Sequence, residues 1–156
     1  MKENIEGLHI QPKGIYVDLT FGGGGHSREV LKKLGKHGRL IAFDQDQDAE
    51  ANVPDDRRIV FIGANFRYLK HYLRYHAIEK VDGILADLGI SSHQIDRPER
   101  GFSFKSESLL DMRMDVRSKQ AASQVLNSYS RADLIRIFRE YGELRNAGAI
   151  VASLEK

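Results

Sequence analysis

The stretch Asp18-Leu-Thr-Phe-Gly-Gly-Gly-Gly-His-Ser27 decides the fold. It follows the apolar run Ile15–Val17 and precedes a helical pattern that begins near Arg28. A strand, a glycine turn and a helix start, in this order, place backbone N–H groups and a helix N-terminus against a bound ligand. Further on, the apolar run Leu40–Phe43 ends in Asp44, whose carboxylate can accept hydrogen bonds from two ribose hydroxyls. The sequence therefore predicts a site for a cofactor that contains a nucleoside.

The glycine pattern favours S-adenosylmethionine over a dinucleotide. A dinucleotide loop has the pattern G-x-G-x-x-G, and counting from Gly22 the third glycine position holds Ser27. Asp18 lies directly before the turn, where its negative charge would repel a diphosphate but suit the ammonium group of an amino-acid-bearing nucleoside. Four consecutive glycines can also form no more than a flexible turn. The neighbouring strand and helix, together with Asp44, make a ligand site the preferred interpretation.

Composition indicates an ordinary soluble domain. The chain has 156 residues, of which 41% are hydrophobic and 29% charged, and this length is enough to bury a core. No apolar run reaches the length of a membrane span, and the first residues contain no signal-peptide core. The absence of cysteine excludes disulfides, thiolate metal sites and a cysteine nucleophile. We expect a cytoplasmic protein without a membrane partner. We expect no metal site either, because His71 and His76 lie off one helical face.

The charge pattern permits RNA binding only through local clustering, because the net charge is +2. One stretch supplies such a cluster, with two aromatic residues, Phe102 and Phe104, inside it. Its basic members are Arg97, Arg100, Lys105, Arg113, Arg117 and Lys119. Charged runs more often form solvated faces, so RNA contact is the alternative interpretation of this stretch.

The order of strand and helix signals predicts a parallel sheet joined by right-handed crossovers. The expected strands span residues 15–19, 40–43, 59–62 and 81–86. The first expected helix has Ser27 as its N-cap and ends at Gly35, and a second carries Phe66 on its apolar face. Acidic or polar residues end the four strands, and the carboxyl ends of parallel strands share one edge, so we expect these side chains to converge on one crevice. They are Asp18, Asp44, Asn65 and Asp87. Turn formers are also common at strand ends, which is the alternative explanation.

From about residue 106 the pattern becomes helical, and a helix is expected to open at Ser130 and Asp133 and to end at Gly142. Before it lies an unusual segment, Val81-Asp-Gly-Ile-Leu-Ala-Asp-Leu-Gly-Ile-Ser-Ser-His-Gln-Ile-Asp-Arg-Pro-Glu-Arg-Gly-Phe-Ser-Phe104, followed by Leu110-Asp-Met-Arg-Met-Asp115. Together with Thr20–Ser27, these motifs closely resemble the ribosomal RNA small subunit methyltransferase H family (MraW-like), bacterial enzymes that methylate N4 of a cytidine in 16S ribosomal RNA.

The resemblance implies a fold, a cofactor and a partner. The implied fold is α/β: a Rossmann-like class I methyltransferase sheet, here its first four parallel strands, with the start of an inserted helical domain. We accordingly expect residues 1–105 to form the S-adenosylmethionine-binding domain and residues 106–156 to form an incomplete helical insertion. The implied methyl donor is S-adenosylmethionine, and the implied partner is ribosomal RNA of the small subunit.

The resemblance also implies site residues. Carried over by position, the family's cofactor-binding residues fall on Gly24, Gly25, His26, Asp44, Phe66, Asp87 and Gln94. The glycines would let the backbone approach the methionine moiety, Asp44 would take the ribose, and Phe66 would offer a surface for adenine. His26 could instead only complete the helix cap.

Asp87 is the candidate catalytic residue. Amine methylation requires alignment of the amine with the methyl group and an acceptor for the positive charge that develops on the amine. Asp87 and the backbone after it lie where amino-methyltransferases place such acceptors, and we hypothesise that Asp87 combines this role with cofactor binding. The cytosine must be single-stranded or flipped out before reaction. Phe102 and Phe104 are candidates to stack on it, although we expect them in the core.

The chain departs from the family in length, because the family's chains are about twice as long, so we expect a fragment. The strand at 81–86 would then form an open apolar edge, which a second copy, a swapped element or a missing segment should cover. Two other functional classes stay open. One is a nicotinamide-dependent oxidoreductase, which Ser27 disfavours, and the other is a non-catalytic module that binds S-adenosylmethionine or RNA.

Overall fold

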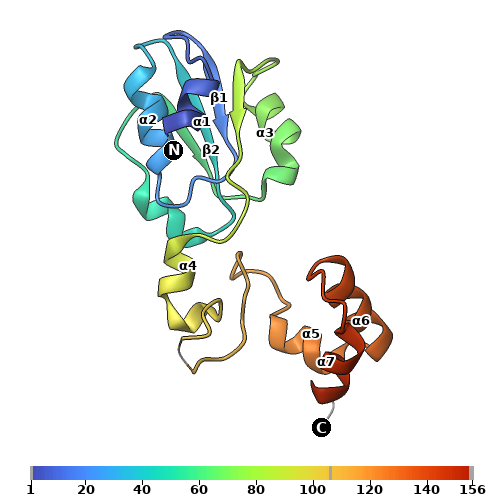
Figure 1. The fold of residues 1–156 in the computed structure, drawn as a ribbon. Helices are drawn as coiled ribbons and strands as arrows, with labels where there is room; N and C mark the ends of the chain where they lie inside the picture. Colours follow the sequence, from blue (N-terminus) through green and yellow to red (C-terminus); the bar gives the residue numbers. More distant parts are fainter. Residues whose placement is uncertain (1, 106, 155–156) are drawn as a thin grey trace. The chain divides into compact units, whose positions relative to one another are not determined.

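The structure, a computed structural model, describes residues 2–105 and 107–154. Its centre is one parallel sheet of four strands in the order β3-β2-β1-β4 (Figure 1). The strands are β1 (Ile15–Asp18), β2 (Arg39–Phe43), β3 (Ile59–Ile62) and β4 (Gly83–Leu85). The predicted α/β, Rossmann-like architecture is confirmed. The strand expected at 81–86 is shorter than predicted.

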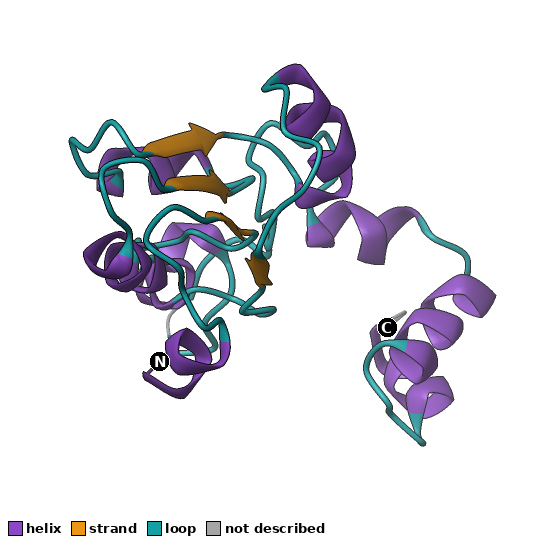
Figure 2. Cartoon of the chain, turned by 90° about the horizontal axis from the view of Figure 1, so that it is seen from above, coloured by secondary structure: helices purple, strands orange, loops and turns teal. Residues whose placement is uncertain are grey.

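The sheet is covered on both faces, as a parallel sheet requires. Side chains alternate across β1, so that Tyr16 and Val17 enter different clusters. Tyr16 packs with residues of α1 (Lys2–Gly7) and α2 (Gly25–Lys33), and Val17 packs with residues of α3 (Leu69–Tyr75). The central strand β2 is fully buried from Leu40 to Phe43. Figure 2 shows helices on the two sides of the strands.

The strand order creates a switch point beside β1. The chain runs outward from β1 through β2 to β3 and then crosses to the other side, where β4 pairs with β1. In open α/β sheets, ligands bind outside the carboxyl ends of the strands at such a switch. The connections there contain three short helical segments, η1 (Gln47–Asn52), η2 (Phe66–Tyr68) and α4 (Ser92–Asp96).

The start of α2 differs from the sequence prediction. The helix begins at Gly25 with Gly24 as its N-cap, so the prediction of Ser27 as the N-cap is wrong. The physical reason is that the Ser27 hydroxyl donates a hydrogen bond to Asp18 at 2.7 Å, below the sheet edge, instead of capping the helix. The edge position of β4 is confirmed, and its Ile84 side chain is 47% exposed.

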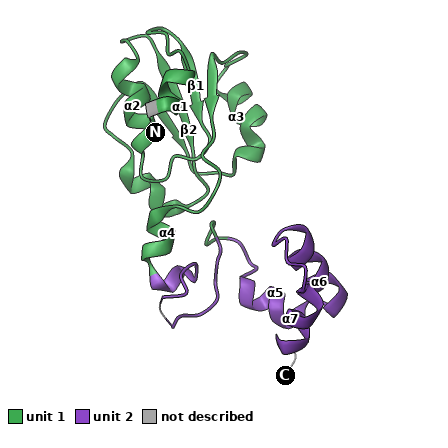
Figure 3. Cartoon of the chain, in the orientation of Figure 1, with its two compact units in different colours: residues 1–97, 114–117 green, residues 98–113, 118–156 purple. Residues whose placement is uncertain are grey.

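The chain divides into two compact units (Figure 3). Residues 1–97 and 114–117 form the sheet unit, and residues 98–113 and 118–156 form the helical unit. The domain boundary that the sequence places after residue 105 stays a prediction. The helical unit contains η3 (Pro98–Arg100), α5 (Ala122–Ser128), α6 (Arg131–Glu140) and α7 (Ala147–Leu154). No helix in the part of the chain that the structure describes is long and apolar enough to span a membrane.

Within the helical unit, α6 starts as the sequence predicts. The Ser130 hydroxyl accepts a hydrogen bond from the backbone N–H of Asp133 at 3.2 Å, which satisfies one of the free donors at the helix start. Leu134 of α6 is buried, as are Ala147 and Val151 of α7. The two helices pack against each other.

Arg58 pairs with Asp56 just before β3 and links this segment to the end of α2. Arg58 donates from Nε and Nη2 to the carboxylate of Asp56, at 2.9 and 2.5 Å, and from Nη1 to the carbonyl oxygen of Leu34 at 2.5 Å. The hydrogen bonds from Arg58 lower the pKa of Asp56 to about 2. A carboxylate with a lowered folded-state pKa stabilises the fold above its unfolded-state pKa.

We expect Asp56→Asn to lower the free energy of unfolding by about 1–3 kcal/mol at pH 7, because the charged hydrogen bonds to Arg58 are lost. Since the pKa of Asp56 is about 2 in the folded chain and 3.8 is its ordinary value, the contribution is complete above about pH 5, declines below that pH and disappears as the pH falls through 2. Urea denaturation of both proteins at pH 7, 5, 4 and 3 measures the difference. A difference that stays constant down to pH 3 would contradict this account.

Candidate functional site

A cavity of about 710 Å³ lies in the sheet unit at the carboxyl ends of the strands. This volume is in the range of cofactor sites. Its walls come from the turn after β1, the segment after β2, the start of η2 and the loop from β4 into α4. The cavity therefore lies at the switch point that the strand order creates.

The glycine turn leaves room in this cavity. Gly22 and Gly23 line it, and a Cβ atom added at either one would meet no other atom within 4 Å. Gly24 faces the protein instead: its φ is +75°, and a Cβ there would lie 2.8 Å from Cζ of Phe21. Gly25 and its neighbour His26 line the cavity. The turn thus favours glycine for its conformation at 22, where φ is +50°, and at 24, and it needs a small residue at 23 to stay open.

Asp18 does not take part in the cavity, although we expected four strand-end side chains to converge there. It is 1% exposed and accepts hydrogen bonds from the Ser27 hydroxyl at 2.7 Å and the backbone N–H of Thr20 at 3.1 Å. Burial raises the pKa of Asp18 above its usual range, and the bond from Ser27 partly offsets this. Asp18 therefore holds the glycine turn and α2 together from beneath. The other three residues, Asp44, Asn65 and Asp87, do line the cavity.

Asp44 joins two of the cavity walls. Its Oδ2 accepts a hydrogen bond from the backbone N–H of Gly22 at 2.7 Å, and its Oδ1 accepts one from the N–H of Asp46 at 2.9 Å. A carboxylate has about four acceptor sites, so each oxygen keeps capacity for a further donor. Asp44 is thus fixed in place by the backbone and still able to accept hydrogen bonds from a ligand.

Asp87 lines the cavity and presents its carboxylate to solvent. Its backbone N–H donates to Oγ1 of Thr20 at 2.8 Å, and its side chain is 68% exposed. Nδ1 of His26 lies 4.0 Å from Oδ2 of Asp87. The other ring nitrogen of His26, Nε2, is buried and has no hydrogen-bond partner among the described residues. The histidine ring therefore lies beside the acid in the lining of the cavity.

Phe66 and Gln94 both line the cavity but in different ways. Phe66 is partly exposed at the start of η2. Gln94 is 4% exposed, its Nε2 donates to Oδ2 of Asp46 at 2.9 Å, and its Oε1 accepts from the N–H of Ser91 at 3.1 Å. Gln94 thus anchors α4 to the segment after β2.

Asp46 supports the site from outside the cavity lining, and the sequence did not single it out. It is buried, caps η1 by accepting from the N–H of Asp48, and receives the amide of Gln94. The signal available in the sequence was its position two residues after Asp44, which on a strand end places both carboxyl groups near one edge. That pattern is common in turns and would not have singled out Asp46.

The basic stretch at 97–119 is mostly committed to local contacts. Arg113 pairs with Asp111 at 2.6 Å, and Arg117 pairs with Asp115 at 2.8 Å. Arg100 is buried. Phe104 is 97% exposed, so the expectation that it lies in the core is wrong, while Phe102 is half-buried.

No group of three or more residues of the metal-binding types is placed to hold a metal ion among residues 2–105 and 107–154.

We expect Gly24→Ala to lower the free energy of unfolding by about 1–3 kcal/mol, because alanine is strained at a positive φ and its Cβ would approach Phe21. Gly23→Ala is the matched control, since its φ is not in the left-handed region and its Cβ points into open space. Chemical denaturation of the two variants measures the difference. Equal losses would show that the turn does not depend on the conformation of Gly24.

Comparison with known proteins identifies relatives of the whole chain. A family model described as the MraW methylase family matches residues 1–156. The ribosomal RNA small subunit methyltransferase H of Flavobacterium psychrophilum is 54% identical over 154 residues, which are 99% of this chain and 53% of that protein. The protein of the same name from Cytophaga hutchinsonii is 56% identical over 158 residues, which are 100% of this chain and 53% of that protein.

A third relative of that name, from Bacteroides thetaiotaomicron, is 52% identical and is matched over 51% of its length. The chain spans about half the length of the curated relatives it matches. The match covers both the glycine turn and the long motif from Val81 to Asp115, which agrees with the resemblance that these residues carry. The chain belongs to the MraW methylase family.

Proposed function

We propose that this chain supplies the cofactor half of an enzyme that transfers a methyl group from S-adenosylmethionine to N4 of a cytidine in small-subunit ribosomal RNA. The observation that carries the proposal is the cavity at the switch point, where the glycine turn, Asp44 and Asp87 meet. The names of the relatives support the ribosomal RNA substrate and the methyltransferase class. The cofactor and the target atom go beyond those names.

The residues of the cavity fit S-adenosylmethionine. The open space at Gly22 and Gly23 suits a ligand that approaches the backbone closely. The free acceptor capacity of Asp44 suits the two ribose hydroxyls, and the partly exposed ring of Phe66 suits the face of an adenine. The set that we assign to the cofactor is completed by Gly24, Gly25, His26, Asp87 and Gln94, with Gly24 and Gln94 shaping the site.

When bound, S-adenosylmethionine supplies an activated methyl group on a sulfonium centre. Asp87 is our candidate acceptor for a hydrogen bond from the exocyclic amine of the cytosine, because its carboxylate is exposed at the cavity. Such a bond orients the amine and stabilises the positive charge that develops on it. Nδ1 of His26 lies 4.0 Å from this carboxylate. We assign the catalytic role to Asp87.

The target nucleotide must leave its stack before N4 can reach the cavity, because a paired cytosine uses this amine. The substrate in this proposal is therefore single-stranded or distorted RNA. The same proposal includes a cytoplasmic location. It also includes a cover for the β4 edge, either a second copy of the chain or a further segment of the protein.

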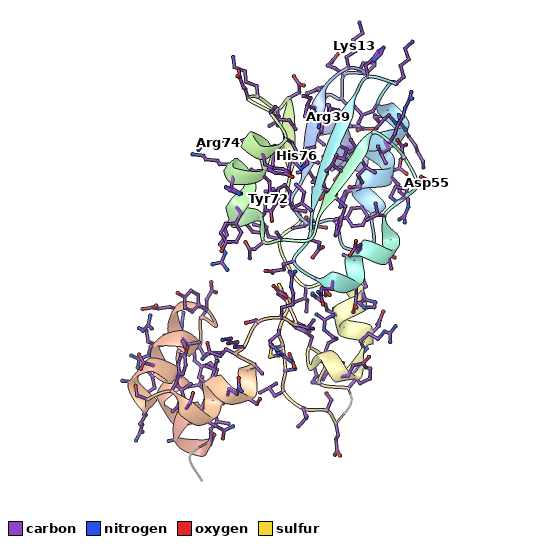
Figure 4. All side chains as sticks on the ribbon, turned by 180° about the vertical axis from the view of Figure 1, so that it is seen from behind. Lys13, Arg39, Asp55, Tyr72, Arg74 and His76 are labelled. Carbon is purple, nitrogen blue, oxygen red and sulfur yellow. The ribbon has the colours of Figure 1, made fainter. Side chains whose placement is uncertain are left out.

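A titration of this 156-residue chain with S-adenosylmethionine tests the cofactor assignment. We expect calorimetry to show binding by the parent and at least a ten-fold weaker affinity in Asp44→Asn, because the ribose loses a charged acceptor. Asp55→Asn is the control: it removes the same charge from an exposed side chain at the other end of the sheet (Figure 4). Equal affinity in the two variants would contradict the assignment, and so would tighter binding of a nicotinamide dinucleotide by the parent.

The role of Asp87 is tested by separating affinity from turnover. We expect Asp87→Asn to reduce methyl transfer to a small-subunit RNA fragment at least 100-fold, because the developing charge on the amine loses its acceptor. Calorimetric titration with S-adenosylmethionine shows how much of that loss arises from cofactor binding. In a second variant, Asp87→Ala, cofactor affinity and turnover that both equal those of the parent would refute the assignment.

One further candidate function has a specific observation behind it. Since the chain spans about half of its relatives, it could bind the cofactor or RNA without transferring a methyl group. Cofactor binding by the parent without any product, in an assay where a full-length relative gives product, would favour this non-catalytic module.

A further inference from the structure

One surface of the sheet unit combines positive charge with exposed aromatic rings. It runs over η2 and α3, from Phe66 to His76, and we call it the α3 patch. Its exposed members are Arg67, Tyr68, Lys70, His71, Arg74 and Tyr75. Tyr75 is 78% exposed, and Figure 4 shows Arg74 extending away from the sheet.

The α3 patch carries charge of one sign. Between Asn65 and Ile78 the sequence has three Lys or Arg residues and two histidines but no Asp or Glu, although the whole chain has 22 acidic residues among 156. Glu79, the next acid along the chain, lines a shallow hollow with Lys70 and Arg74. In the described residues, however, no carboxylate lies within ion-pair distance of Arg67, Lys70 or Arg74.

A solvated helix face is the simplest alternative explanation, and α6 of this chain shows what such a face looks like. Arg136 lies between Asp133 and Glu140, at 3.9 and 3.4 Å, in the i,i+3 and i,i+4 spacing that stabilises a helix. In the α3 patch the same spacings bring like charges together, Arg67 near Lys70 and Lys70 near Arg74. Like charges at this spacing destabilise a helix, so the patch is better explained by an anionic partner.

The rings of the patch indicate what kind of anion it suits. The guanidinium of Arg67 lies 5.2 Å from the ring centre of Tyr68. The rings of Tyr75 and His76 meet edge to face, with their centres 5.2 Å apart. Exposed aromatic rings interleaved with cations are the combination with which proteins hold single-stranded nucleic acid, through phosphates and stacked bases. A membrane surface or an acidic protein would use the charge but would not need the flat rings.

The α3 patch is also continuous with the cavity. Asn65 and Phe66, at the start of η2, line the cavity, and Arg67 and Tyr68 follow directly. From Leu69 to Tyr75, α3 extends roughly 10 Å away from that point, at about 1.5 Å per residue. A single strand of nucleic acid lying along α3 would therefore lead to the cavity.

We propose that the α3 patch binds the single-stranded RNA that flanks the target nucleotide, with Arg67, Lys70 and Arg74 on the phosphates and Tyr68 and Tyr75 stacking on bases. The proposal rests on the RNA methyl transfer proposed above and adds a location for the RNA. This location differs from the basic stretch at 97–119, where two arginines are paired with acids and a third is buried.

The test compares two triple variants of equal charge. One replaces the cations of the patch, Arg67→Gln, Lys70→Gln and Arg74→Gln. The other replaces three exposed lysines that precede strands β1 and β2 in the chain, Lys13→Gln, Lys33→Gln and Lys36→Gln. Fluorescence anisotropy measures the affinity of each for a labelled 12-nucleotide oligocytidylate at several salt concentrations.

We expect the patch variant to bind at least ten-fold more weakly at low salt. The slope of log affinity against log salt concentration should become shallower by about 2, since each lost phosphate contact on a single strand accounts for roughly 0.7. The control variant should stay within two-fold of the parent. Equal weakening of both variants would overturn the proposal. So would a parent that binds no RNA, or one that sediments with vesicles of anionic lipid but does not bind the oligonucleotide.

Tyr75→Leu separates stacking from charge. It should weaken binding about five-fold or more while leaving the salt dependence unchanged, because stacking involves no counterion release. An unchanged affinity in Tyr75→Leu would remove the stacking part of the proposal.

Titration of the patch variant with S-adenosylmethionine completes the set, because none of its three substituted residues lines the cavity. Cofactor affinity equal to that of the parent shows that the fold and the cavity are intact. The loss of RNA affinity is then attributed to the α3 patch. Loss of cofactor affinity in this variant would overturn the separation of the two surfaces. Failure of the parent to bind the cofactor would instead count against the proposed function.

Discussion

The site depends on the backbone hydrogen bonds that the carboxylate of Asp44 accepts. It ends the fully buried strand β2 and accepts backbone hydrogen bonds from two loops, the glycine turn through Gly22 and the start of η1 through Asp46. From Asp46 the connection continues to Gln94 and so to α4. Three walls of one cavity are therefore held by a short series of carboxyl groups, each charged group satisfied by N–H donors. The His93–Asp48 pair, at 2.9 Å, joins α4 to η1 a second time.

This arrangement explains why the site combines an open surface with a rigid frame. The two sides of the glycine turn have different tasks: Asp18 and Ser27 fix it from the buried side, and Gly22 and Gly23 keep the other side clear. The Asp87 side chain lines the same cavity and is 68% exposed. A site built on strand ends gains its precision from the sheet beneath.

Most of the sheet unit could be predicted from the sequence, because its signals are local. The apolar runs at 40–43 and 59–62 are strands, and the Ser130–Asp133 pattern does open a helix. The predictions were wrong where a residue's role depends on a partner elsewhere in the chain. Ser27 looks like a helix cap until Asp18, nine residues earlier, takes its hydroxyl, and Phe104 looks like a core residue although no packing partner covers it in the described structure.

The site could be predicted in part for the same reason. Strand-end acids and the glycine turn are visible as a pattern, and the structure brings Asp44, Phe66 and Asp87 to one cavity. The role of Asp46 could not be seen, because it depends on Gln94, a residue 48 positions away. The α3 patch was equally hidden. Its cations are unremarkable as a sequence and become notable only when the contacts show that arginines elsewhere have acidic neighbours.

The strand order has a consequence for how the cavity forms during folding. Ile15 of β1 pairs with Arg39 of β2, whereas the Asp82 carboxylate that accepts from the N–H of Ile15, just before β4, lies 67 positions along the chain. Closing the longer loop costs about 1 kcal/mol more in chain entropy. Contacts between β1 and β2 are therefore favoured early, and β4 joins a sheet that already exists. Asp44 after β2 and Asp87 after β4 both line the cavity, so we expect the wall after β2 to form with the β1–β2 pair and the wall after β4 to form later.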